Sequence, residues 1–251
     1  MRPALLAALT LAAGATALSG LTVTTTAAAP AHPVPAGHRT VDFALHHAGR
    51  HGLVNGFNQD GGNWSGYAAT GSGFSSVTST WTEPSVTCNS TNDLFAPWVG
   101  IDGYGTSTVE QTGVATDCSS GSPQYAGWYE MYPAAPVYYS NAVGAGDVIR
   151  ATVTRSGSTY TLTLSDTSRG WTRTTTKSLS RARNASAEVI MESPTAAYPR
   201  FGTVNFSGST VNGSALSNFG PVALDASNSR GFEDHTSALS GGNFSISYLR
   251  E

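Results

Sequence analysis

From Asn63 to the C-terminus, short runs of alternating polar and apolar residues recur roughly every ten residues. The runs are rich in Thr, Val, Tyr and Phe, which favour β-strands, and clusters of Ser, Gly and Asn separate them. A side-chain period of two is typical of strands that bury one face. No window has the 3.6-residue period of an amphipathic helix, so the pattern predicts an all-β fold.

These runs predict eleven strands, and no fixed internal repeat relates them. The expected strands are Phe74–Thr82, Leu94–Ile101, Ser107–Val114, Tyr125–Tyr132, Val148–Arg155, Thr159–Ser165, Thr172–Ser178, Ala187–Glu192, Thr203–Phe206, Val222–Asp225 and Phe244–Leu249. So many short strands in one chain indicate two sheets packed face to face, a β-sandwich.

The first 29 residues have the composition of a secretory signal peptide. Arg2 precedes an apolar run from Ala4 to about Leu21, and small residues end the stretch at Ala29. A membrane-spanning helix is the alternative, but Gly and Thr interrupt the run. We therefore expect a secreted, extracellular protein with no membrane partner.

Residues 30–62 have a different character, with three prolines near their start and five of the six histidines. The histidines are His32, His38, His46, His47 and His51. Such a segment is a pro-segment or linker and not a domain, which leaves residues 63–251 as one folded domain. Because imidazoles titrate near pH 6.5, the segment could dock at neutral pH and detach in acid. A disordered His-rich leader is the alternative.

Charged residues are scarce, at 12% of the chain, and the net charge is −3. No basic stretch supports binding to nucleic acid. Few ion pairs are available to be lost in acid, so the composition suits an acidic medium. Export predicts a disulfide between Cys88 and Cys118, with two buried thiols as the alternative.

Acids and an amide interrupt two regions that otherwise look like buried strands. The residues are Asp102, Glu110, Gln111, Glu130, Glu188 and Glu192. Burying such groups is costly unless they are paired or used in a reaction. Alternation places Glu188 and Glu192 on one face of their strand, which indicates a cleft; an edge strand with its acids in water is the alternative.

Several chemistries lack their motifs in this sequence. There is no HExxH motif or Cys/His cluster, so we expect no metal and no cofactor. GxSxG, DTG and DSG are absent, and so is a phosphate-binding glycine loop. Carboxylate chemistry assisted by an amide remains. A Glu can act as a base at pH 3–4, and an amide can face a developing oxyanion at any pH.

The chain also resembles the glutamic peptidases, or eqolisins, which are secreted acid endopeptidases. The resemblance rests on blocks in the family's order: Asn63–Tyr67, FSSVTSTWTEPSV, WVGIDG, QTGV, WYEMYP, AGDVI, AEVIME and FGTVNF. It implies a sandwich of two antiparallel sheets, concanavalin-like or jelly-roll-like, with a cleft on the concave face. It also implies that the substrates are extended polypeptides and that the protein is a monomer.

Position by position, the resemblance identifies Gln111 as the catalytic glutamine and Glu192 as the catalytic glutamate. Further residues lie at family positions around the cleft: Trp98, Asp102, Trp128, Glu130 and Tyr132, with Asn63 and Trp64 at its edge. Core packing is the alternative for Trp128 and Tyr132. Glu110 departs from the apolar residue usual before the glutamine, and alternation points it away from Gln111, so we expect it to be peripheral.

Two other functions fit the residues without the resemblance. Paired acids with flanking aromatic rings suit a glycosidase, which needs two carboxylates and no amide. A lectin-like module could use the same rings as a platform for sugars.

Overall fold

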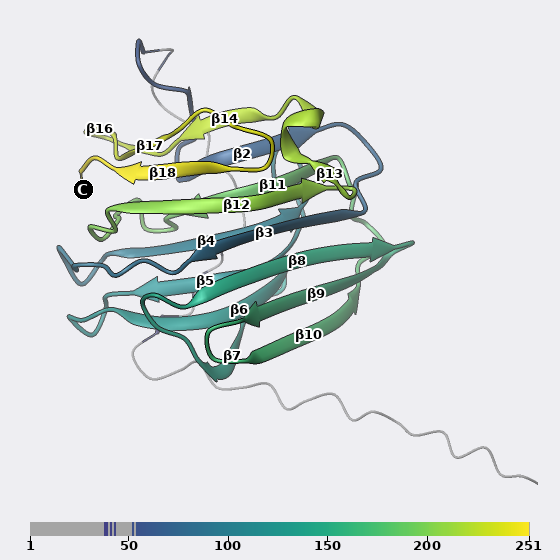
Figure 1. The fold of residues 1–251 in the computed structure, drawn as a ribbon, viewed down its shortest axis with the longest axis horizontal. Coiled ribbons are helices and arrows are strands. Elements are labelled where there is room, and N and C mark those ends of the chain that lie inside the picture. Colours follow the sequence, from purple (N-terminus) through teal and green to yellow (C-terminus); the bar gives the residue numbers. More distant parts are fainter. Residues whose placement is uncertain (1–37, 40, 42, 44–51, 53, 251) are drawn as a thin grey trace, which may run out of the picture. The chain divides into compact units, whose positions relative to one another are not determined.

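The structure, a computed structural model, describes residues 38, 39, 41, 43, 52 and 54–250. The expected signal peptide and four of the five leader histidines lie outside these residues. In the described part, two large β-sheets pack against each other, and the helical content is one 3-10 turn, η1 (Leu216–Phe219) (Figure 1). The predicted all-β sandwich is confirmed.

The first sheet, called sheet 1, carries the candidate site and has eight strands. In order across the sheet these are β1 (Gln59–Asp60), β14 (Val222–Asp225), β2 (Trp64–Thr70), β11 (Ser186–Glu192), β4 (Leu94–Ile101), β5 (Val109–Asp117), β6 (Gln124–Tyr132) and β7 (Val137–Ala142). All neighbours are antiparallel except β1 and β14, which pair in parallel at the edge.

The second sheet, sheet 2, lies in front of sheet 1 in Figure 1. In order it contains β10 (Trp171–Ser178), β9 (Thr159–Asp166), β8 (Val148–Ser156), β3 (Ser76–Thr82), β12 (Thr203–Val211), β18 (Phe244–Tyr248) and β17 (Asp234–Thr236), and β13 (Ser214–Ala215) pairs with β12. A separate short pair joins β15 (Ser227–Asn228) and β16 (Gly231–Phe232).

The main core lies between the two sheets, where β3 packs against β4 and β11. Every second residue of a strand points into this core. Val99 and Val189 come from sheet 1, and Val153 and Leu162 come from sheet 2. Each such side chain contributes about 1.5–3 kcal/mol on burial. A second buried cluster covers the opposite face of sheet 1 and is rich in tryptophan. Sheet 1 is therefore buried on both faces.

All eleven expected strands are present, with bounds that shift by a few residues at some ends. The sequence analysis missed β2 and β7, along with the short edge strands. β2 reads WSGYAAT and lacks a strong β pattern, but it pairs with β11 on one side and β14 on the other. Its Gly66 has a φ of +120°, and a Cβ there would collide with the carbonyl oxygen of Val189. Tertiary pairing makes this segment a strand.

The end of the expected leader belongs to sheet 1. The backbone N–H of Asn58 donates to Oδ2 of Asp225 at 2.8 Å, and β1 pairs with β14. The Ser227 hydroxyl donates to Oδ1 of Asp60 at 2.6 Å. These contacts extend the folded part of the chain to residues before Asn63.

The predicted disulfide between Cys88 and Cys118 is confirmed, with a Cα–Cα distance of 5.8 Å. It ties the loop before β4 to the loop after β5, so it encloses two neighbouring inner strands of sheet 1. In the chain-entropy model a loop of this size contributes about 3–4 kcal/mol to stability. The cross-link fixes one end of the candidate site.

Candidate active site

Three rows of side chains cross the outer face of sheet 1, the face turned away from sheet 2. Strand pairing defines them as row one (Trp64, Glu192, Ala96), row two (Ile190, Trp98, Gly113, Trp128) and row three (Glu188, Gly100, Gln111, Glu130). Residues that neighbour them in sequence point into the core between the sheets. The strand register therefore gathers both proposed catalytic residues and four of their expected neighbours on one face.

Glu192 ends β11 with both carboxyl oxygens held by N–H donors. Nδ2 of Asn63 donates to Oε1 at 2.9 Å, and the indole Nε1 of Trp98 donates to Oε2 at 3.1 Å. The side chain is only 1% exposed. Burial raises the pKa of Glu192 well above its ordinary value, and the hydrogen bonds from Trp98 and Trp64 act in the opposite direction. The carboxyl is thus held in place by donors on both of its oxygens.

Gln111 lies on β5, opposite Glu130 of β6. Its Nε2 donates to Oε2 of Glu130 at 2.6 Å, and both side chains are buried. No donor among the described residues bonds to Oε1 of Gln111. The amide carries two N–H groups, so a single bond to Glu130 orients it and leaves a second N–H for another acceptor.

Trp98 lies in the row between Glu192 and Gln111. Its ring extends over Gly100, where a Cβ would lie 2.8 Å from Cζ3 of Trp98 and 3.1 Å from Cβ of Gln111. Glycine at position 100 therefore gives the indole room to lie between the two proposed catalytic residues. The ring of Trp64 meets that of Trp98 edge-on, with centroids 5.0 Å apart.

Trp128 and Tyr132 belong to the tryptophan-rich outer cluster and not to the core between the sheets. Trp128 is fully buried, because the ring of Phe43 stacks on it. Tyr132 is half-buried at the end of β6 and packs at the margin of the cluster. Their expected role as walls for a substrate stays a prediction.

Asp102 is engaged with a loop. Its Oδ2 accepts the backbone N–H groups of Arg183 and Asn184, and its Oδ1 accepts that of Ala185, each at 2.8 Å. These bonds fix the segment that leads into β11, and they account for a buried carboxylate with a left-handed backbone (φ +66°). Its expected place at the cleft stays a prediction.

Glu110 lies on the face of β5 opposite to Gln111, as alternation predicts. Glu110 therefore lies outside the candidate site, as expected, but it is fully buried between the sheets. Burial raises the pKa of Glu110 to about 8, and the Asp102 carboxylate nearby adds to the rise. Below about pH 8, Glu110 is therefore buried in its protonated, uncharged form.

Glu188 is a fifth buried acid of the site region, and the residue roles taken from the family resemblance do not include it. It shares the outer face with Glu192 and lies in the row of Gln111. The backbone N–H of Tyr104 donates to its Oε1 at 3.3 Å, and burial raises its pKa well above the ordinary value. The sequence pointed to Glu188 only through alternation, which places it on the same strand face as Glu192.

In the described part of the chain, no three His, Cys, Asp or Glu side chains come close enough together to hold a metal ion. In the same residues, no helix has the length and apolar character needed to cross a membrane.

This fold matches what the resemblance to glutamic peptidases implied. The chain belongs to the peptidase A4 family, whose model matches residues 62–248. That range begins just before Asn63 and contains every candidate site residue.

Individual relatives agree with this assignment. Aspergillopepsin-2 from Aspergillus niger is 32% identical over 112 aligned residues, which cover 36% of this chain and 40% of that protein. The chain thus matches less than half the length of this curated relative. A scytalido-glutamic peptidase structure with a peptide-based transition-state analogue superposes with a TM-score of 0.66 at 25% identity, covering 75% of this chain and 98% of the other. The structure of aspergilloglutamic peptidase from Aspergillus niger superposes with a TM-score of 0.53 at 26% identity. The match covers 62% of this chain and 99% of the other.

Proposed function

We propose that this protein is a secreted endopeptidase that works in acid, with Glu192 as general acid and base and Gln111 as oxyanion donor. The observation that carries the proposal is the placement of a doubly held carboxyl and an oriented amide on one face of one sheet, with Trp98 between them. Among the structural neighbours, one glutamic peptidase holds a peptide-based transition-state analogue, and the eqolisin SCP-B holds the tripeptide Ala-Ile-His. Extended polypeptides are accordingly the proposed substrates.

In the proposed reaction, the ionised Glu192 takes a proton from a water molecule while the water oxygen attacks the scissile carbonyl carbon. The carbonyl oxygen becomes an oxyanion, which accepts the free N–H of Gln111. The protonated Glu192 then gives its proton to the amide nitrogen as the C–N bond breaks, and the carboxylate is regenerated. No covalent enzyme species is needed.

The first step requires Glu192 to be ionised, which burial opposes. The N–H donors from Asn63 and Trp98 favour the charged form, so the balance depends on how much of the site is open to water. A site opened to solvent would have a lower Glu192 pKa than the closed site described above. The base could then act in acid, where an imidazole would be protonated.

The precursor organisation belongs to the same proposal. The composition of the N-terminus supports export by a signal peptide over residues 1–29, followed by a pro-segment that ends before Asn58, where the chain joins sheet 1. The proposed working form is a monomer.

The test is digestion of a denatured protein across pH 2–7 by the secreted chain and three variants. Glu192→Gln removes the base, and Gln111→Ala removes the donor, so we expect losses of about 100-fold or more in kcat for each. Glu188→Gln is the matched control, because it changes the same residue type on the same face of the same strand, and it should keep activity within a few-fold of wild type.

If wild type cleaves nothing while it is folded, the peptidase proposal is wrong. If Gln111→Ala keeps full activity and both glutamate variants are inactive, two carboxylates are the catalytic groups. A glycosidase then becomes the better explanation.

A further inference from the structure

The outer face of sheet 1 is closed in this chain, although no third sheet covers it in the described part. Glu192, Gln111 and Trp98 are at most 1% exposed. A peptidase has to admit a polypeptide to these groups. Four described residues of the expected leader, His38, Arg39, Val41 and Phe43, lie against this side of the sheet.

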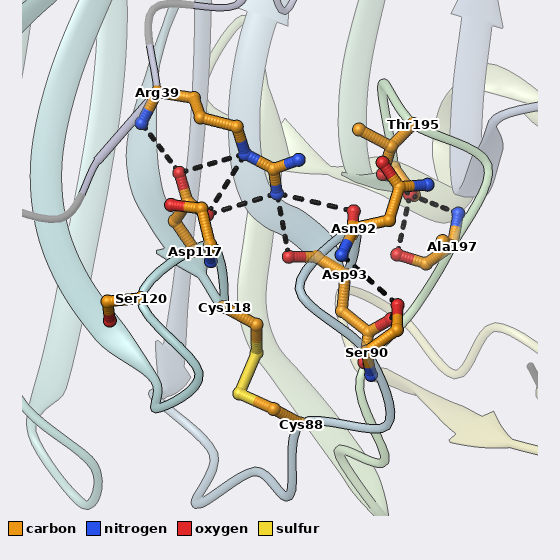
Figure 2. Close-up of polar contacts among 12 residues, drawn as sticks. Arg39, Cys88, Ser90, Asn92, Asp93, Asp117, Cys118, Ser120, Thr195 and Ala197 are labelled. Atoms are coloured by element: carbon orange, nitrogen blue, oxygen red, sulfur yellow. Dashed lines mark hydrogen bonds and ion pairs between the residues drawn. A yellow bond between two sulfur atoms is a disulfide. The ribbon is translucent and has the colours of Figure 1, made fainter.

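Arg39 is held in a built site at the end of β5 (Figure 2). Its guanidinium contacts the buried carboxylate of Asp117, with Nη2 3.0 Å from Oδ1 and Nε 3.1 Å from the same oxygen. Nη2 also donates to the carbonyl oxygens of Asn92 at 3.2 Å and Asp93 at 2.9 Å. A carboxylate beside two carbonyl oxygens complements a planar guanidinium.

The backbone of Arg39 is bound as well as its side chain. Its N–H donates to Oδ2 of Asp117 at 2.6 Å, and the Tyr138 hydroxyl donates to its carbonyl oxygen at 3.1 Å. The disulfide at Cys118 follows Asp117 directly and holds this end of the sheet (Figure 2). The clamp for Arg39 is therefore part of a rigid framework.

Phe43 supplies a second anchor beside the proposed catalytic residues. Its ring is fully buried and stacks on Trp128, with centroids 4.4 Å apart and planes 20° from parallel. Trp128 precedes Glu130 by two residues on the same face of β6, and Glu130 orients Gln111. The aromatic anchor thus lies one row from the proposed oxyanion donor.

We propose that the leader binds this face through Arg39 and Phe43 as an intramolecular stand-in for the substrate, and that the places of these two residues become two substrate subsites when the leader departs. One subsite, formed by Asp117 and the two carbonyl oxygens, takes a basic side chain. The other, on Trp128, takes an aromatic side chain. The inference rests on the proposed peptidase function and adds a substrate preference to it.

The groups that the departing leader uncovers explain the two preferences. Without Arg39, the carboxylate of Asp117 is a buried charge that lacks this cation, so a substrate arginine or lysine replaces what has been lost. Without Phe43, Trp128 presents an apolar ring face to water, and a stacking side chain covers it again. Arg39 and Phe43 are four positions apart in the chain, so the preferred sequence has a basic residue four positions before an aromatic one.

Docking of the leader is tested first, in full-length chains that all carry Glu192→Gln so that no self-cleavage occurs. Trypsin at neutral pH cuts after Arg39 only when this segment leaves the surface. We expect Phe43→Ala and Asp117→Asn each to speed this cut by about fivefold or more. Val54→Ala, at an exposed leader position (44% exposed), should leave the rate unchanged. Phe43→Ala lies outside the sandwich, so it tests docking even if Asp117→Asn fails to fold. Equal rates in Phe43→Ala and its parent would overturn the docking.

The subsites are tested with matched synthetic peptides that contain Arg-Ala-Ala-Ala-Phe between polar flanks, and with versions in which Arg or Phe is replaced by Ala. For the acid-incubated wild-type chain we expect kcat/KM to fall about tenfold for each replacement. Trp128→Ala should lose the preference for Phe and keep that for Arg, and Asp117→Asn should do the reverse.

Cleavage of all peptides at equal rates would overturn the subsites and leave the peptidase proposal intact. No cleavage of any peptide or denatured protein would overturn the peptidase proposal and the subsites together, while the trypsin result would still decide whether the leader docks.

Discussion

The indole Nε1 of Trp98 donates a hydrogen bond to Oε2 of Glu192 at 3.1 Å, while the far edge of the same ring lies over Gly100 beside Gln111. One rigid side chain thus contacts the proposed base and borders the proposed oxyanion donor. The ring thus lies between the two proposed catalytic groups and contacts both of their surroundings.

Trp98→Phe keeps most of the ring and removes the donor. A hydrogen bond to a charged group is worth about 1.5–3 kcal/mol, so kcat should fall roughly 10- to 100-fold. The lost donor favoured the ionised carboxyl, so the acid limb of the pH–rate profile should move to higher pH. Digestion assays across pH 2–7 measure both effects. Trp171→Phe on β10 is the control, and an unchanged profile in Trp98→Phe would contradict the prediction.

Gly100→Ala places a methyl group against the Trp98 ring and Gln111. Because packed side chains yield little, the variant should lose about 1–3 kcal/mol of stability and at least tenfold in activity. Thermal unfolding and digestion assays provide the measurements. Gly71→Ala, where a Cβ meets only ordinary contacts from Phe74, is the control. Full activity in Gly100→Ala would show that the ring can move without consequence.

Glu110 should make the fold less stable as pH rises. Its folded pKa of about 8 exceeds the ordinary 4.5, so its stabilising contribution is complete below pH 4.5 and is lost between there and pH 8. At about 1.4 kcal/mol per pKa unit, the loss is on the order of a few kcal/mol. Glu110→Gln should flatten the fall of Tm between pH 4 and pH 8, as measured by calorimetry. A curve parallel to that of wild type would be evidence against a buried, protonated Glu110.

The leader should undock in acid. Burial lowers the pKa of His38, which faces the Tyr138 ring and lies near Asp117 and Arg39, so docking favours the neutral imidazole. Docking is then complete above pH 6.5 and weakens as pH falls below that value. The Asp117 carboxyl acts in the same direction at lower pH. Burial raises its pKa, but hydrogen bonds from Arg39 outweigh this and hold the pKa below the ordinary 3.8.

Hydrogen exchange of the leader amides in a full-length Glu192→Gln chain measures this release, after correction for intrinsic rates. Protection should fall between pH 7 and pH 4, and His38→Asn should move the fall to lower pH. Protection that stays constant down to pH 3 would contradict the switch.

Processing should leave Asn58 on the mature enzyme. Asn58 and Asp60 are bonded to Asp225 and Ser227, and their removal would leave the Asp225 carboxylate without two of its donors. N-terminal sequencing of the acid-processed product should therefore find a start after Phe43 and before Asn58. A mature start at Asn63 would show that β1 is dispensable.

The sequence by itself determined eleven of the strands of this protein and the face on which their residues lie. Alternation separates Gln111 from Glu110 and pairs Glu188 with Glu192, because a strand's side-chain direction depends only on its own backbone. Composition also predicted the disulfide between Cys88 and Cys118, since export makes oxidation of a cysteine pair the expected outcome.

Only the tertiary structure decided which of these faces meet. β2 becomes a strand through its partners, Glu110 is buried by the second sheet, and Trp98 lies between Glu192 and Gln111 because β4 separates β11 from β5. The contact between Phe43 and Trp128 joins residues far apart in the sequence. Strand order and register arise from packing among distant segments, and a local pattern carries no record of them.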